Sequence, residues 1–395
     1  MGAEIVVVGA GVVGASVAYH LAAAGQERVT VADARARDLL PGSTGLAPGF
    51  VGQLSATTEL AVLAMDGVAT YRSLAPTAFR QVGCLEIATT QARLEQAHAD
   101  VEHGRGLGIE AQVLDADTAV ALAPALVNAE RALGALYIPS DGAAEPIALT
   151  EALVAAAVAY GVTFQWGTRV RALETAHGRV VGVRTDDEVL PARAVVLAAG
   201  IWGPALAASA GVRLPMVAVQ HPYVRTTELP DLDDTPIDAP IVRYPDHAVY
   251  TRRHGRHYGL GTYSHDPIPL VAAAETAERP YRETDFGAAI AAATALVPTF
   301  RTAGVGSRLN GAFALTPDEL PLVGPVPDLP GLWVAEASWV THAGGVGRHL
   351  ANLLLDTGDL AVDPARLAPD RFAQWSDERV YATALGHYRG IYDAH

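Results

Sequence analysis

The sequence contains no lysine and a single cysteine. All 28 basic residues of the 395-residue chain are arginines. Because the protein has no side-chain amine, it cannot form a pyridoxal or aldolase Schiff base, and it lacks the lysine of a phosphate-binding loop. The lone Cys84 excludes an internal disulfide and any site built from several cysteines, so we interpret it as a small core residue.

Positive charge is scarce as well. The 28 arginines face 43 acidic residues, which gives a formal net charge of −15. Binding to nucleic acid or an anionic membrane requires a basic surface, so we expect neither partner. The sequence also lacks an HExxH pattern, a metal-spaced histidine set and a GxSxG motif. We therefore expect no metal site, and zinc hydrolysis and serine esterase chemistry lack support.

Long apolar runs are missing too. The N-terminus lacks the basic start and apolar stretch of a signal peptide. The longest uncharged apolar run, 195–212, is interrupted by glycines and a proline, which is typical of a strand, turn and helix rather than a membrane span. Since half of the residues are hydrophobic, a large core is expected. We expect a soluble, cytoplasmic enzyme of two or three structural units.

A glycine-rich turn near the N-terminus is the strongest motif. Gly9, Gly11 and Gly14 follow the apolar strand Ile5–Val8, and Asp33 ends the next strand. Such glycines allow a tight turn, close approach of a pyrophosphate and close helix packing, while the acid accepts ribose hydroxyls. The complete strand–helix–strand order predicts a dinucleotide site, and the acid argues against a 2′-phosphate. The motif alone does not separate NAD from FAD.

Other segments predict two kinds of sheet. The buried strands Ala194–Ala199 and Leu332–Glu336 suit the same parallel sheet as the N-terminal unit. Val217–Thr226 alternates like a half-exposed strand, and Ala248–Arg252 with His257–Tyr263 reads as a hairpin. The predicted fold class is α/β, with a discontinuous nucleotide-binding domain and a separate antiparallel sheet.

Several further motifs occur in order along residues 1–350. They are Gly42–Gly49, Gln81–Gly83 with Leu85–Thr90, Pro139–Gly142, Gln220–Val224, Thr316–Asp318 with Pro321, and Val334–Glu336 with Trp339–His342. Together they resemble the flavoprotein family of D-amino-acid oxidase, glycine oxidase and sarcosine oxidase. The likeness is greatest to the flavin half of dimethylglycine oxidase and sarcosine or dimethylglycine dehydrogenase.

This resemblance implies a Rossmann-like FAD-binding domain of the glutathione-reductase type and an antiparallel-sheet substrate domain. We expect the FAD-binding domain to comprise residues 1–80, 145–215 and 305–395. The substrate domain would comprise residues 81–144 and 216–304.

The resemblance also implies a cofactor site for FAD. Val12 and Val13 would lie against its diphosphate, and the 341–347 loop would place a helix N-terminus beside the flavin, where negative charge develops on reduction. The implied cofactor-binding residues are Gly9, Gly11, Val12, Val13, Gly14, Asp33, Ala34, Gly42, Ser43, Thr44, Gly45, Leu46, Val170, Gly200, Tyr250, Thr341, His342, Ala343, Gly344 and Gly345.

Three departures from the family pattern carry consequences. Leu46 stands where related enzymes have a histidine that holds the flavin covalently, so we expect non-covalent FAD. Some sarcosine oxidases use a lysine above the flavin to promote reaction with oxygen. Here either a histidine or an arginine supplies that charge, or oxygen is not the acceptor. Because the bifunctional relatives continue into a folate-binding half beyond the position of His395, we expect no tetrahydrofolate chemistry.

On the substrate side, His221 and Tyr250 match positions that shape the amine site in the dimethylglycine oxidases. Tyr250 and Arg252 are two residues apart on a predicted strand and share a face. We expect Arg252 to clamp a substrate carboxylate. Without the resemblance, His221 would be interpreted as a core histidine and Arg252 as part of a solvated face.

The expected function is oxidation of the C–N bond of a small amino acid or N-substituted glycine by hydride transfer to flavin N5. The imine would hydrolyse to an aldehyde and an amine, and oxygen or another acceptor would reoxidise the flavin, with hydrogen peroxide released to oxygen. Two alternatives stay open. One is a NAD-dependent dehydrogenase, and the other is a non-catalytic flavin-binding subunit of a hetero-oligomeric oxidase.

Overall fold

The computed structural model describes residues 5–234, 238–270 and 275–392. Its α/β fold contains a six-stranded sheet in the order β20-β21-β13-β1-β2-β9, in which only β20 runs antiparallel to its neighbour. These strands are β1 (Ile5–Val8), β2 (Val29–Asp33), β9 (Thr163–Trp166), β13 (Ala194–Leu197), β20 (Leu322–Pro325) and β21 (Leu332–Glu336). They come from distant parts of the sequence.

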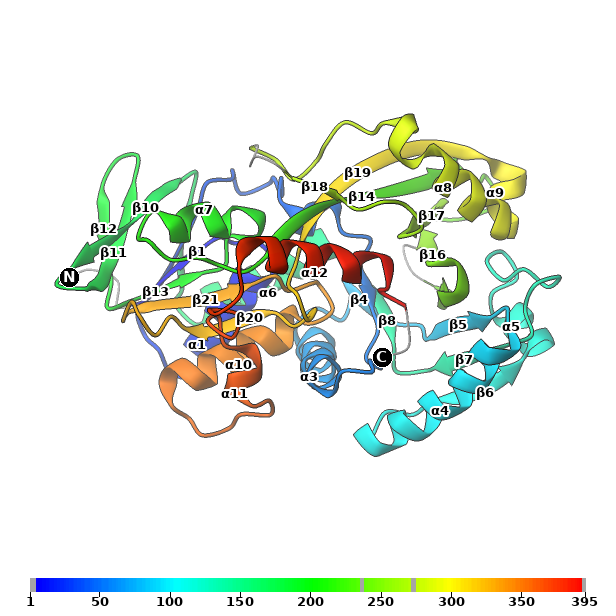
Figure 1. The fold of residues 1–395 in the computed structure, drawn as a ribbon, viewed down its shortest axis with the longest axis horizontal. Coiled ribbons are helices and arrows are strands. Elements are labelled where there is room, and N and C mark those ends of the chain that lie inside the picture. The colour runs from blue at the N-terminus through cyan, green and yellow to red at the C-terminus, as the bar shows by residue number, and fades with distance from the viewer. Residues whose placement is uncertain (1–4, 235–237, 271–274, 393–395) are drawn as a thin grey trace.

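The parallel sheet is covered on both faces, which explains why β1 is apolar throughout (Figure 1). Ile5 and Val7 pack toward one side, against the core formed with α1 and α10, while Val6 and Val8 pack toward the other. The helices on the first side are α1 (Val12–Ala23), α3 (Thr58–Leu74), α6 (Pro146–Ala159) and α10 (Ala343–Leu355). The second side is covered by the small sheet of β10 (Val170–Ala176), β11 (Arg179–Thr185) and β12 (Val189–Pro191), with α7 (Gly203–Ala208) beside it.

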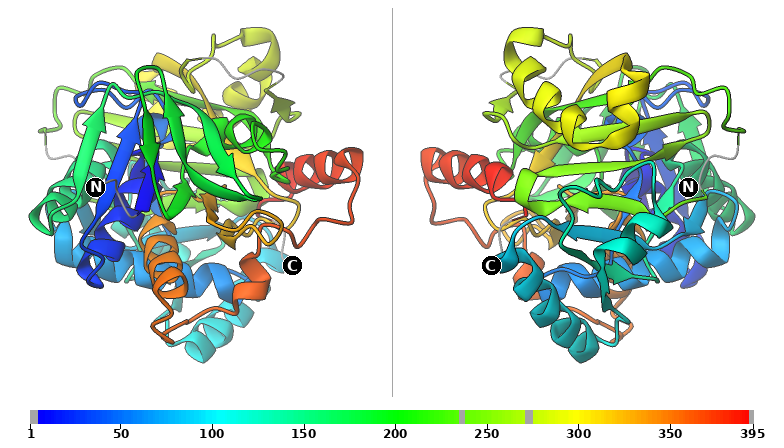
Figure 2. Two further views of the ribbon diagram at one scale, coloured as in Figure 1. Left: turned by 90° about the vertical axis from the view of Figure 1, so that its left-hand side faces the viewer. Right: turned by 90° about the vertical axis from the view of Figure 1, so that its right-hand side faces the viewer.

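The nine-stranded sheet is mostly antiparallel and has the order β18-β14-β17-β16-β15-β5-β7-β6, with β19 paired to β14. Its strands are β5 (Cys84–Ala88), β6 (Gln112–Asp115), β7 (Gly134–Ile138), β14 (Val217–Thr226), β15 (Ile241–Tyr244), β16 (Val249–His254), β17 (His257–Thr262), β18 (Ile268–Pro269) and β19 (Val305–Leu315). The right-hand view of Figure 2 shows this sheet from the end at which four helices lie. They are α4 (Gln91–Leu107), α5 (Ala116–Leu122), α8 (Glu283–Leu296) and α9 (Pro298–Ala303).

The remaining elements connect these parts. They are α2 (Ser43–Leu46), the small sheet of β3 (Phe50–Val51), β8 (Gly142–Ala144) and β4 (Phe79–Gln81), then α11 (Pro364–Leu367) and α12 (Asp377–Arg389). Among the described residues, no helix combines the length and the apolar character needed to cross a bilayer.

The α/β class and the two kinds of sheet agree with the prediction. The expected hairpin is formed by β16 and β17, which pair from Val249↔Thr262 to His254↔His257 around a turn at Gly255. Val305–Leu315, which lies in the predicted FAD-binding segment 305–395, instead pairs along its length with β14 of the nine-stranded sheet. The division into two domains stays a prediction.

Candidate cofactor and substrate site

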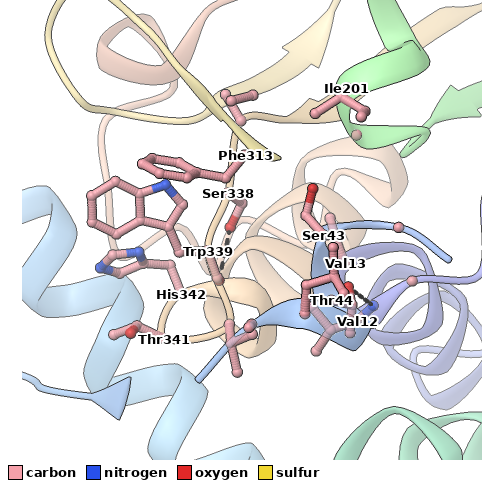
Figure 3. Close-up of a pocket in the computed structure, with 18 of the residues that line it drawn as sticks. Val12, Val13, Ser43, Thr44, Ile201, Phe313, Ser338, Trp339, Thr341 and His342 are labelled. Carbon is pink, nitrogen blue, oxygen red and sulfur yellow. Dashed lines mark hydrogen bonds between the residues drawn. The ribbon is translucent and has the colours of Figure 1, made fainter. Parts of the chain in front are cut away.

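One cavity of about 910 Å³ is lined by residues of both large sheets, a volume that suits a large organic ligand. Figure 3 shows part of its wall, where Val12, Val13 and Thr44 face Trp339 and His342 across the cavity. The predicted site residues that line it are Gly9, Gly11, Val12, Val13, Asp33, Ala34, Gly42, Ser43, Thr44, Leu46, Val170, Gly200, His221, Tyr250, Thr341 and His342. The N-terminal glycine turn and the loop before α10 therefore belong to the same cavity.

The glycine turn joins β1 to α1 with the geometry that its sequence requires. Gly9 has φ of +103°, a conformation that side chains disfavour, and a Cβ there would lie 2.4 Å from the carbonyl oxygen of Ala198. Asp33 holds the turn in place, since its Oδ2 accepts a hydrogen bond from the Ala10 amide and its Oδ1 accepts one from Arg35. The N-terminus of α1, with its partial positive charge, is thereby turned toward the cavity.

The loop around α2 borders the same helix end. The Val12 amide donates to Thr44 Oγ1 at 3.3 Å, the contact drawn in Figure 3. Leu46 lines the cavity and packs near Gly311 of β19. This loop therefore links the glycine turn to the nine-stranded sheet.

Five predicted cofactor residues do not line the cavity: Gly14, Gly45, Ala343, Gly344 and Gly345. Close approach of neighbouring backbone accounts for the glycines among them. A Cβ on Gly345 would lie 2.2 Å from the carbonyl oxygen of Leu63 in α3, and one on Gly14 would lie 1.9 Å from that of Gly9. For Gly14 this is the packing role that the motif predicts. Gly344 and Gly345 allow α10 to approach α3, and their contact with the cofactor stays a prediction.

The polar groups of the wall fit FAD. Glu336 ends β21 and lines the cavity, and its Oε1 accepts a hydrogen bond of 2.7 Å from the Ala199 amide. Its buried Oε2 has no hydrogen-bond partner among the described residues, and burial raises the pKa of Glu336 to about 8. A ligand rich in hydroxyl groups would satisfy this oxygen, while the N-terminus of α1 suits a diphosphate. No cluster of three metal-ligating side chains occurs in the described ranges.

At the other end of the cavity, Tyr250 of β16 and His221 of β14 form a buried pair. The Tyr250 hydroxyl lies 2.8 Å from His221 Nε2, and the two rings stack with their centroids 5.7 Å apart. Phe50 and Tyr263 pack against this pair. Burial lowers the pKa of His221 to about 3, so the imidazole is neutral at neutral pH and can accept a hydrogen bond.

Arg252 is buried beside the cavity and does not form part of its wall, so its role as a substrate clamp stays a prediction. Its side chain is 1% exposed and does not line the cavity. Its Nη2 is 2.8 Å from Glu145 Oε1 and 2.9 Å from His254 Nδ1. Arg252 shares a face with Tyr250, as predicted, but it lies farther along β16, where Glu145 already binds it.

Arg243 of β15 contributes a guanidinium to the cavity wall, and the sequence prediction did not name it. It lines the cavity, is paired with Tyr250 in the sheet register, and donates from Nη1 to Glu86 Oε1 at 2.9 Å. A charged residue inside the otherwise apolar strand Ile241–Tyr244 was the sequence signal that could have identified Arg243 as a residue of the cavity wall. Tyr392, which also lines the cavity, was missed because it lies far along the chain from the other residues of the site.

Comparison with known proteins agrees with this geometry. Residues 4–353 match the DAO family model, described as FAD dependent oxidoreductase. The chain is 29% identical to dimethylglycine dehydrogenase from Rattus norvegicus and 30% identical to 4-methylaminobutanoate oxidase (formaldehyde-forming) from Paenarthrobacter nicotinovorans. These matches cover 95% and 96% of this chain but only 45% and 47% of the two relatives, so the chain spans about half of their length.

A relative of similar length and two solved structures complete the comparison. The chain is 30% identical to D-amino acid dehydrogenase from Cereibacter sphaeroides, with 94% of this chain and 97% of that protein covered. L-proline dehydrogenase from P. horikoshii has a TM-score of 0.84 at 23% identity, covering 94% and 98% of the two chains. Glycine oxidase from Geobacillus kaustophilus has a TM-score of 0.78 at 24% identity, covering 93% and 98%. These two structures share the fold.

The match over most of the chain also decides between the two dinucleotides that the glycine turn left open, in favour of FAD over NAD. The protein belongs to the DAO family of FAD-dependent oxidoreductases.

Proposed function

We propose that the protein oxidises the C–N bond of a small amine that carries a carboxylate, such as an N-substituted glycine or a small amino acid. The observation that carries this proposal is the buried Tyr250–His221 pair, which lies in the cavity that the glycine turn opens onto. The names of the relatives support the substrate class, because dimethylglycine and 4-methylaminobutanoate are both N-methylated amino acids.

FAD, when bound, supplies the hydride acceptor. The protein's own residues prepare the amine, which must be neutral before its α-hydrogen can leave as hydride. The Tyr250–His221 pair favours the neutral amine, since the His221 imidazole is uncharged and the surrounding aromatic rings exclude water. The imine product then hydrolyses to an aldehyde and a smaller amine.

Oxygen or another acceptor then takes the electrons, and with oxygen the product is hydrogen peroxide. The positive charge that promotes reaction with oxygen would come from Arg243. His342 cannot supply it, because burial and the nearby Arg243 lower the pKa of His342 to about 4 and keep its imidazole neutral. FAD is held non-covalently, because the Leu46 side chain cannot bond to the flavin.

Acid precipitation tests the non-covalent attachment. We expect all of the flavin to appear in the supernatant, because the α2 loop offers no histidine for a covalent bond. Absorbance of the supernatant and the redissolved pellet measures the partition. Flavin that stays with the denatured protein contradicts this attachment.

Anaerobic flavin reduction tests the activity itself. We expect at least one N-substituted glycine or small amino acid to bleach the flavin absorbance, and Tyr250→Phe or His221→Ala to slow this reduction by about tenfold or more. FAD content should stay near that of the wild type. The exposed Tyr160 provides a matched control, and Tyr160→Phe should leave the rate unchanged. If FAD is bound but no amine reduces it, the result would favour the alternative that the protein is a non-catalytic flavin-binding subunit.

Substitution of Arg243 tests the anchor for the substrate carboxylate, a role that we assign to Arg243 in place of Arg252. We expect Arg243→Gln to weaken binding of a carboxylate-bearing substrate roughly tenfold to hundredfold. This factor corresponds to the free energy lost with one or two hydrogen bonds to a charged group. An amine of the same shape without the carboxylate should lose much less. The exposed Arg308→Gln serves as control. Equal losses for both amines would remove Arg243 from this role.

A further inference from the structure

A second tyrosine lies behind His221, on the side away from Tyr250. Helix α12, red in Figure 1, packs against β14 and β19 and places Tyr388 in a core cluster with Val219 and Leu315. The Tyr388 ring is fully buried, and its hydroxyl lies 2.8 Å from His221 Nδ1. Both ring nitrogens of His221 are thus bonded to tyrosine hydroxyls.

The hydrogen bonds continue from Tyr388 toward the surface. The Tyr388 hydroxyl lies 2.7 Å from His265 Nε2, and a longer contact of 3.3 Å joins it to the carbonyl of Gln220. His265 is half-buried, and its Nδ1 lies 2.8 Å from the carbonyl oxygen of the exposed Asp266. Four side chains therefore connect the cavity wall to the outside of the protein.

Two backbone carbonyls and the contact distances determine the direction of the bonds in this chain. The Asp266 carbonyl can only accept, so His265 Nδ1 carries the hydrogen and its Nε2 is an acceptor. The Tyr388 hydroxyl donates to this Nε2 at 2.7 Å in preference to the Gln220 carbonyl, which lies 3.3 Å away. Tyr388 has then used its only hydrogen, so it accepts from His221 Nδ1. His221 Nε2 is left to accept from Tyr250. Each member donates to the next, and all donors point outward from the cavity.

We propose that Tyr250, His221, Tyr388 and His265 form a proton relay that carries the proton lost by the substrate amine to the protein surface. The relay rests on the proposed function, because an amine must bind beside Tyr250 to supply the proton. Tyr250 accepts the ammonium proton as its own hydrogen passes to His221 Nε2. His221 releases the hydrogen on Nδ1 to Tyr388, whose hydrogen passes to His265 Nε2. One proton is gained by His265 and one is lost by the amine, and His265 then releases a proton to water.

The surroundings of both imidazoles suit transfer rather than storage of a proton. His221 is faced by Tyr250, Tyr263 and Tyr388, and burial keeps it neutral. Burial also lowers the pKa of His265, so it gives up a proton readily at neutral pH.

The charged groups around the outer end come from the loop after β17 and from two helices. Asp266 beside His265 is ion-paired with Arg389 of α12, and Asp285 of α8 contributes a second negative charge. His265 also packs against the rings of Tyr388 and Phe286. A proton that reaches His265 therefore arrives among groups that exchange with solvent.

Stopped-flow reduction of the flavin under anaerobic conditions, as a function of pH, tests the relay in the FAD-bound protein. We expect Tyr388→Phe, which keeps the ring and removes the hydroxyl, to slow reduction about tenfold or more at neutral pH, where the substrate is an ammonium ion. Above the pKa of the substrate amine, solvent already supplies the neutral form. The rates of variant and wild type should there agree within about twofold.

His265→Ala interrupts the relay at its outer end and provides a second test. We expect the same pH-dependent loss, and added imidazole should restore the rate, because it can occupy the space of the missing side chain. Tyr381→Phe on the same helix is the matched control, since its ring is 44% exposed, and it should behave as the wild type. FAD content and circular dichroism establish that each variant is folded.

The outcomes separate the relay from the function on which it rests. If amines reduce the wild-type flavin but Tyr388→Phe loses the same factor at every pH, or loses nothing, the relay is wrong and the function stands. If His265→Ala keeps the wild-type pH profile, or imidazole does not rescue it, the outer half of the relay is wrong. If no amine reduces the wild-type flavin, both proposals are wrong.

Discussion

The site depends on the two large sheets facing one cavity, because each sheet supplies only half of its chemistry. The parallel sheet brings Asp33, Glu336 and the N-terminus of α1, which are polar groups suited to the diphosphate and hydroxyls of a dinucleotide. The nine-stranded sheet brings the Tyr250–His221 pair, whose burial keeps the imidazole neutral. The polar groups and the buried aromatic pair thus lie in one cavity because different layers of the fold contribute them.

Much of the cofactor end was predictable from the sequence, because its signals are local. The glycine turn and Asp33 lie within one strand–helix–strand unit, so spacing alone specifies how they meet. Gly344 and Gly345 are harder to interpret from the sequence, since glycines in the first turn of a helix can serve either a ligand or a neighbouring helix. Only the position of α3, which is not encoded nearby, distinguishes these roles.

The substrate end was harder to predict, because its residues meet through strand pairing over long distances. Alternation correctly places Tyr250 and Arg252 on one face of β16, but it does not tell which of them lies over the cavity. Arg243 reaches the cavity from the neighbouring strand β15, and the register that aligns it with Tyr250 is absent from local patterns. Tyr388 is more distant still, since α12 must fold back onto β14 and β19 before its hydroxyl meets His221.

A crystal structure of the protein with bound FAD tests most directly whether one cavity serves both ends. The account predicts the diphosphate at the N-terminus of α1, near Gly11, and the ring system beside Tyr250 and the loop of Thr341 and His342. Flavin density that leaves the glycine turn empty, or that places the ring away from Tyr250, would contradict it.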